Sequence, residues 1–210
     1  MCIRDRKQGT LFIVTAPSGA GKTSLVNELL HQIKNLLVSV SHTTRPIRPS
    51  ETNGKDYHFI DERRFLSMLS NGDFLETADV YGYKYGTSSK WVNAELGRGN
   101  DVILEIDWQG AIQIKDQFPS ACSIFILPPS LEALIDRLHK RQQDDDETIA
   151  RRMAQAKEVI SHVKDADYAV VNDRFDETVG EVSSIIQSRR LKIEAQMVNL
   201  ANLLANLAKD

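Results

Sequence analysis

The octapeptide Ala-Pro-Ser-Gly-Ala-Gly-Lys-Thr at residues 16–23 restricts the fold of this chain more than any other segment does. It follows a short apolar, β-forming run at residues 11–15 and precedes a helical pattern over residues 23–33. A strand, a glycine-rich loop and a helix in this order form the opening unit of an α/β fold with a phosphate loop. A chance glycine-rich turn is the alternative, but it would not explain why all three parts occur together.

The residue types of this loop suit a phosphate ligand, although Ala16 stands where the phosphate-loop pattern has its first glycine. Gly19 and Gly21 let the backbone turn closely so that N–H groups point at the phosphate, and the helix adds its positive end. Lys22 is expected to reach the β- and γ-phosphates, and the Thr23 hydroxyl to face Mg²⁺. Alanine fits at position 16 if its φ stays negative. The nucleotide-binding residues predicted from this segment are Ala16, Pro17, Ser18, Gly19, Ala20, Gly21, Lys22, Thr23 and Ser24.

Apolar runs alternate with helical patterns along the rest of the chain. Such alternation predicts a mostly parallel sheet with helices on both faces, which is a doubly wound α/β architecture. Further strands are expected at residues 37–40, 101–106, 123–127 and 168–171, and helices at residues 62–69, 90–96, 109–117, 131–140, 148–163 and from residue 176 to the C-terminus.

Size and charge narrow the class of protein. The 210 residues, 41% of them hydrophobic, suit one domain with insertions. Because 26 basic residues face 29 acidic ones, the chain lacks the positive field of a general nucleic-acid binder, and any anion site must be local. The sequence has no apolar run long enough to cross a membrane, and its two distant cysteines, Cys2 and Cys122, favour the reducing cytoplasm. Residues 1–8 form a polar leader to which no role is assigned.

Residues 41–88 differ from the rest, because proline, glycine, arginine and aromatic residues crowd together there. This composition suggests an insertion specialised for polar recognition. Arg45 and Arg48, beside Ser41 and Tyr57, could grip a dianionic phosphate, since arginine donates in a bidentate fork. A solvated basic turn is the alternative.

Several motifs in and near this insertion closely resemble the guanylate kinase family. They are the string at residues 41–59, Phe-Leu-Glu at 74–76, Tyr-Gly-Thr-Ser at 85–88 and Leu-Glu-Ile-Asp-Trp-Gln-Gly at 104–110. The likeness extends from about residue 9 to about residue 190. It implies a transferase of the P-loop nucleoside monophosphate kinase class, which phosphorylates GMP, and dGMP, with ATP in purine nucleotide metabolism. Its implied parts are a three-layer core at residues 9–40 and 89–210, an inserted α+β GMP-binding domain at 41–88 and a small lid at about 137–152.

The resemblance also implies how GMP is held. Its phosphate would contact Ser41, Arg45, Arg48, Tyr57 and Tyr85, and its guanine would contact Glu76, Thr87 and Asp107. Guanine presents N–H donors that carboxylates accept, whereas adenine presents an acceptor at N1 and would leave a buried carboxylate unpaired. Taken alone, Glu76 would be an ordinary surface acid.

Two carboxylates follow the apolar run at residues 102–104. Glu105 and Asp107 are two residues apart, so they point to the same side at the edge of the sheet where α/β folds bind ligands. We assign Asp107 to guanine and Glu105 to the outer shell of Mg²⁺. Solvation at the sheet edge is the alternative for Glu105.

The resemblance places the family's lid arginines at Arg137, Arg141 and Arg152, which together with Lys22 would form the catalytic group. Arginines on a closing lid could stabilise charge on the transferring phosphoryl group and exclude water. The acidic turn at residues 142–146 replaces the family's glycine-containing turn, which predicts a stiffer hinge. Asn172 matches the family's position near the adenine of ATP, with a plain turn as the alternative.

Two other readings compete with a guanylate kinase. A P-loop kinase for another substrate would keep the loop but not need Glu76 and Asp107. An inactive protein-binding module of the same family would be expected to lose Lys22 or the lid arginines, which are present here. Finally, residues 199–208 predict a Leu/Ala/Asn helix, expected to dock on its own core, with a homo-oligomer contact as the alternative.

Overall fold

A five-stranded parallel sheet forms the centre of the protein. The structure is a computed structural model, and it describes residues 8–80, 82–140 and 146–208. In spatial order its strands are β2 (Leu36–Val38), β7 (Asp101–Glu105), β1 (Leu11–Thr15), β8 (Cys122–Leu127) and β9 (Tyr168–Val171). All of β1 is buried, because it lies in the middle of the sheet. The parallel α/β fold predicted from the sequence is confirmed.

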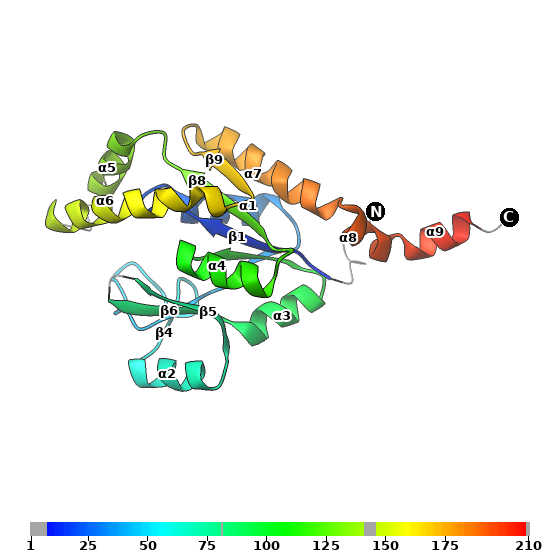
Figure 1. Ribbon diagram of the computed structural model, residues 1–210, viewed down its shortest axis with the longest axis horizontal. Coiled ribbons are helices and arrows are strands. Elements are labelled where there is room, and N and C mark those ends of the chain that lie inside the picture. Colours follow the sequence, from blue (N-terminus) through cyan, green and yellow to red (C-terminus); the bar gives the residue numbers. More distant parts are fainter. Residues whose placement is uncertain (1–7, 81, 141–145, 209–210) are drawn as a thin grey trace.

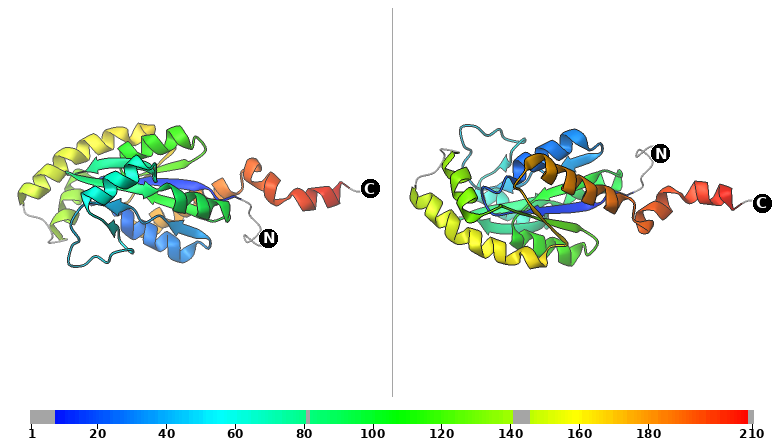
Figure 2. Two further views of the ribbon diagram at one scale, coloured as in Figure 1. Left: turned by 90° about the horizontal axis from the view of Figure 1, so that it is seen from below. Right: turned by 90° about the horizontal axis from the view of Figure 1, so that it is seen from above.

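Helices cover both faces of this core sheet, and the alternation of side chains along β1 shows why. Phe12 and Val14 pack against α1 (Lys22–Gln32) and α7 (Phe175–Arg190), whereas Leu11 and Ile13 belong to the core cluster under α3 (Ser89–Gly97) and α4 (Trp108–Gln117). The two views in Figure 2 show α1 and α7 on one side of the sheet, and α4 and α6 (Asp146–Ser161) on the other.

A second, four-stranded sheet lies beside the core (Figure 1), between residues 42 and 88. Its order is β4 (His58–Phe59), β3 (His42–Thr43), β6 (Tyr83–Ser88) and β5 (Phe74–Val80), and α2 (Glu62–Ser70) accompanies it. The sequence patterns predicted the helix but not the strands. Two of the strands have only two residues each, and β5 is an edge strand with mixed polarity, so neither gives a clear period-two signal.

Four further helical elements complete the described part of the chain. They are α5 (Leu131–Lys140), the 3-10 helix η2 (His162–Asp165), α8 (Ile193–Asn199) and α9 (Ala201–Leu207). No helix in the described ranges is long and apolar enough to cross a membrane.

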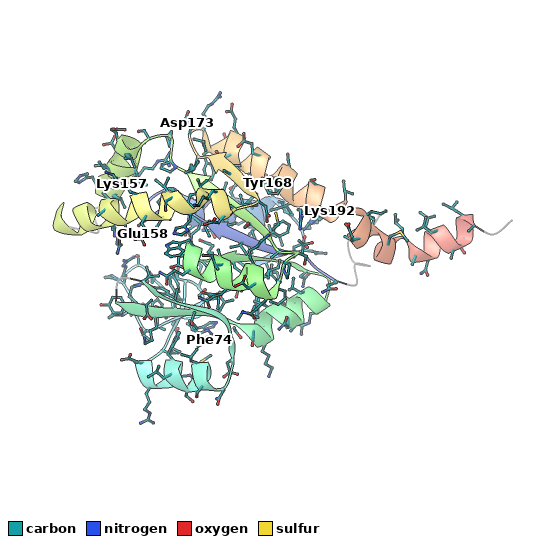
Figure 3. The ribbon with its side chains drawn as sticks, viewed as in Figure 1. Phe74, Lys157, Glu158, Tyr168, Asp173 and Lys192 are labelled. Atoms are coloured by element: carbon teal, nitrogen blue, oxygen red, sulfur yellow. The ribbon has the colours of Figure 1, made fainter. Side chains whose placement is uncertain are left out.

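The C-terminal part differs from the prediction of one continuous helix that docks on the core. The helix breaks after Arg190, and α8 and α9 project away from the body (Figure 1), from the point that Lys192 marks in Figure 3. Leu203, Leu204 and Leu207 on α9 are exposed. The prediction of core docking is therefore wrong, because no described face of the core covers this apolar side.

A buried ion pair anchors α7 just before the projection. Arg190 Nε donates to Asp101 Oδ2 at 2.6 Å, and Nη2 donates to the Lys34 carbonyl at 3.0 Å. Asp101 Oδ1 in turn accepts from the Thr10 N–H at 2.7 Å. Both members of the pair are buried, so the carboxylate at the start of β7 joins the end of α7 to the segment that leads into β1.

Candidate nucleotide-binding site

The loop between β1 and α1 has the backbone that a phosphate cradle needs. Gly19 and Gly21 have φ of 91° and 95°, in the left-handed region that favours glycine. A Cβ atom at Gly21 would lie 2.5 Å from Asn172 Nδ2, so this position has no room for a side chain. Among the described residues Asn35 is the one non-glycine with positive φ. Ala16 therefore meets the condition under which alanine can replace the first glycine.

Lys22 and Thr23 both reach from α1 to the end of β7. Lys22 Nζ donates to the Ile106 carbonyl at 3.2 Å. Burial lowers the pKa of Lys22, while the charges of Glu105, Asp107 and Glu76 oppose this shift. The Thr23 hydroxyl donates to Glu105 Oε2 at 3.0 Å. The lysine and the acids predicted for two different ligands thus meet at one edge of the core sheet.

The side chains of Arg137 and Asn172 bind the backbone of the phosphate loop at Ala20. Asn172 Nδ2 donates to the Ala20 carbonyl at 2.7 Å. Arg137 donates to the Asn172 carbonyl at 2.8 Å and to the Ala20 carbonyl at 3.3 Å. A hollow of about 290 Å³ opens next to these contacts, lined by Gly19, Gly21, Ser24, Arg137, Asn172, Asp173 and Phe175.

Of the other predicted lid arginines, the structure describes Arg152, which lies on α6. Arg152 is half-buried on this helix, and Ala156 of α6 packs with Leu134 of α5 and with Ala20 of the phosphate loop. Arg141 and most of the acidic turn at 142–146 lie outside the described residues. The structure thus brings α5 and α6 against the loop.

A buried acidic pocket lies where the second sheet meets α4. Thr87 Oγ1 donates to Glu76 Oε1 at 2.6 Å, and both side chains are buried. Burial raises the pKa of Glu76 to about 7, and the nearby Asp107 charge adds to the shift, whereas Thr87 and Lys22 oppose it. Asp107 caps α4 by accepting from the Gly110 N–H at 2.9 Å, and burial raises its pKa too. Glu76, Thr87 and Asp107, which the sequence analysis assigned to guanine, therefore lie close together.

An arginine and two tyrosines form a second cluster in the insertion. The Arg45 guanidinium lies 5.4 Å from the ring centre of Tyr57, and the rings of Tyr57 and Tyr85 meet edge-to-face at 5.8 Å. Burial, followed by the Tyr85 charge, raises the pKa of Tyr57 to about 12, so this hydroxyl remains a donor at neutral pH. Arg48 is exposed nearby, and the Ser41 carbonyl accepts from the His58 N–H at 2.9 Å.

Two residues with clear structural roles were not singled out from the sequence. Glu51 binds Arg45 in a bidentate pair, at 2.7 and 3.0 Å, and accepts from the Arg48 N–H at 2.9 Å. An acid six residues after an arginine in the same loop is a weak signal that could have found it. Gln113 on α4 binds the backbone of Thr77 in β5. A glutamine on a helix gives no signal of such a contact.

Comparison with known proteins agrees with this geometry. The guanylate kinase sequence family matches residues 8–189. Guanylate kinases of Methylobacillus flagellatus and Coxiella burnetii are each 52% identical to this chain, over 95% and 96% of it and over 99% and 98% of their own lengths. A crystal structure of guanylate kinase from Anaplasma phagocytophilum superposes with a TM-score of 0.76 at 35% identity, covering 90% of this chain and 89% of that one. A phosphate loop facing a buried acidic pocket, together with this similarity over nearly the whole length, shows that the chain belongs to the guanylate kinase family.

Proposed function

We propose that this nucleoside monophosphate kinase transfers the γ-phosphoryl group of ATP to GMP, and to dGMP, through a donor site at the phosphate loop and an acceptor site at the second sheet. The main support is the position of Lys22, whose ammonium group lies at the end of β7 within the field of Glu105, Asp107 and Glu76. In Figure 3, Phe74 marks the second sheet and Asp173 the turn after β9.

The donor site would hold the ATP phosphates on the backbone N–H groups of residues 18–24, with Lys22 on the β- and γ-phosphates. The Thr23 hydroxyl and the Glu105 carboxylate offer adjacent oxygen ligands of the kind that Mg²⁺ prefers, directly or through water. Bound Mg²⁺ would neutralise charge on the phosphates. The hollow near Asn172 would lie beside the adenine.

The acceptor site would hold the GMP phosphate at Arg45, with Ser41, Arg48, Tyr57 and Tyr85 around it. Burial opposes the charge of Arg45, but Glu51 and then Tyr85 together raise its pKa, so the guanidinium is already charged and oriented before GMP arrives. Glu51 thus fixes the orientation of the Arg45 guanidinium.

At the other end of GMP, Glu76 and Asp107 would accept from the guanine N1–H and N2–H groups, and Thr87 would orient Glu76. AMP would leave these buried carboxylates without a donor, which penalises its binding.

Phosphoryl transfer itself would need positioning and charge neutralisation more than a general base, because the GMP phosphate is already an anionic nucleophile. Arg137, Arg141 and Arg152 would stabilise the charge on the transferring group as the segment at about 137–152 closes. The proximity of α5 and α6 to the loop supports this role.

The C-terminal projection supports a homo-oligomer as part of the proposal. Ile193 and Met197 on α8, Leu200 between the two helices, and Leu204 and Leu207 on α9 are spaced alternately by four and three residues, which is the spacing of a helix–helix seam. Residues 193–207 carry one charged side chain, so a second copy of the same neutral seam is a better match than a charged partner. Short helices without such packing are marginal in water. A cytoplasmic location fits the buried free thiol of Cys122.

An acceptor panel tests the proposed function. With ATP and Mg²⁺, ADP release is measured for GMP, dGMP, AMP, CMP and UMP in turn. We expect kcat/KM for GMP and dGMP to exceed that for the other acceptors by about 10⁴-fold, because AMP leaves a buried acid unpaired. A higher kcat/KM with any other acceptor would refute the specificity.

Substitution at the two sites should separate catalysis from acceptor binding. Lys22→Met is expected to lower kcat about 10²-fold or more with a small change in GMP affinity. Arg45→Met should instead raise the KM for GMP about 10-fold or more while kcat changes less. Initial rates and GMP titrations are measured near pH 8.5, above the pKa of about 7 that Glu76 has in the parent. Glu51→Gln, as a control, should raise the KM for GMP less than Arg45→Met does. Equal loss of GMP affinity in both main variants would contradict separate sites.

The buried carboxyl of Glu76 predicts a pH-dependent stability difference. Its folded-state pKa, about 7, lies above the ordinary 4.5, so the folded protein binds the proton more tightly and loses stability as pH rises through this window. Glu76→Gln removes the buried charge and should raise the free energy of unfolding near pH 8 by up to about 3 kcal/mol, with little change near pH 4. Urea unfolding at both pH values checks this. A variant less stable than the parent near pH 8 would argue against the buried charge.

Sedimentation tests the oligomer. The full chain is expected to sediment as a dimer at micromolar concentration, and a chain ending at residue 192 as a monomer. This truncation keeps the Arg190–Asp101 pair, so the core should remain folded. If both chains show the mass of a monomer, the C-terminal seam is not an interface between copies.

A further inference from the structure

We infer that Gln113 is a positioning residue, which sets the separation of the two guanine-binding carboxylates by fastening strand β5 to helix α4. The inference rests on the proposed function, because it assigns a role within the acceptor site. Gln113 touches neither carboxylate in the contacts that the structure describes; its amide binds the backbone of the neighbouring residue Thr77.

The outer edge of β5 explains why such a fastening is needed. β5 is the last strand of its sheet, so one edge pairs with β6 and the other faces no strand of the described sheet. The Thr77 N–H donates to Gln113 Oε1 at 3.1 Å, and Gln113 Nε2 donates to the Thr77 carbonyl at 2.7 Å. One planar amide therefore binds both groups of a single residue, as a neighbouring strand would. These two hydrogen bonds keep β5 from sliding along the strand direction relative to α4.

A second glutamine extends this contact. Gln117, one turn further along α4, donates from Nε2 to the Leu75 carbonyl at 2.7 Å. Leu75 and Thr77 flank Glu76, so both backbone neighbours of this acid are bound to the same helix. The side chain of Glu76 then points to the interior and reaches Thr87.

Helix α4 also carries the other carboxylate. Asp107 caps the helix through the Gly110 N–H, and a Cβ atom at Gly110 would lie 2.4 Å from Glu76 Oε2. Asp107, the contact with Glu76 and the Gln113 amide thus follow one another along one helix, about one turn apart. Since a helix is rigid over this length, the separation of the two acids depends on how firmly β5 is held against it.

The consequence concerns specificity more than folding. The donors on guanine have a fixed spacing, so two acids that accept from them must keep a matching spacing. A displacement of about 1 Å can reduce activity about 10²-fold. The Thr87 bond alone cannot prevent such a displacement, because Thr87 belongs to the same sheet as Glu76 and would move with it.

Gln113→Met tests the inference, since methionine has a similar length but offers no amide. We expect the KM for GMP to rise about 10-fold and the ratio of kcat/KM for GMP over AMP to fall about 10-fold or more, with the KM for ATP unchanged. Gln117→Met, which removes one bond further from Glu76, should show a smaller change in the same direction. Gln187→Met on the exposed face of α7 is the matched control and should match the parent.

The outcomes separate the possible roles. All rates are measured well below the unfolding midpoint of each variant, which is determined in parallel. A lower midpoint with unchanged GMP affinity and GMP:AMP ratio would make Gln113 merely structural and overturn the inference. If Gln113→Met does not fold, Gln113→Glu replaces it, because one oxygen can still accept from Thr77 while the other repels its carbonyl; the same readouts decide. If the parent itself does not prefer GMP, the proposed function fails instead.

Discussion

The burial of the Lys22 ammonium group beside three carboxylates is the constraint on which the rest of the site depends. Removing a lysine from water is costly, and here the charges of Glu105, Asp107 and Glu76 offset part of that cost. The same lysine lowers the cost of burying Glu76 and Asp107, whose pKa values burial raises. The phosphate loop and the acidic pocket are therefore energetically linked before any ligand binds, and neither can change its charge without affecting the other.

Helix α4 joins the two sheets that carry these charges. It begins at the end of β7 in the core, packs Ile114 into the core beneath the sheet, and holds β5 of the second sheet on its other side. The second sheet is thus attached to the core by more than the chain segments that lead into and out of it. This arrangement lets a polar, loop-rich insertion present a buried carboxylate at a defined place.

Much of the core could be predicted from the sequence, because β1, β8 and α1 have apolar runs and loop residues that admit few alternatives. The short strands β3 and β4 could not, since their pairing depends on contacts distant in the sequence. For the site, the structure brings Glu76, Thr87 and Asp107 close together, and likewise Arg45, Tyr57 and Tyr85, all of which the motifs singled out. Their roles toward GMP, and those of Arg137 and Asn172 toward ATP, stay predictions. Glu51 and Gln113 were missed because their importance lies in a tertiary partner rather than in a motif.

The Arg190–Asp101 pair lies at the start of β7, whereas the phosphate loop follows the far end of the neighbouring strand β1. The projecting end of the chain therefore leaves the molecule at the edge of the core sheet opposite to the edge that carries the phosphate loop. A fluorophore, an affinity tag or a surface tether attached beyond α9 would leave the nucleotide edge open to solvent, so the enzyme could be immobilised with its substrate entrance facing outward.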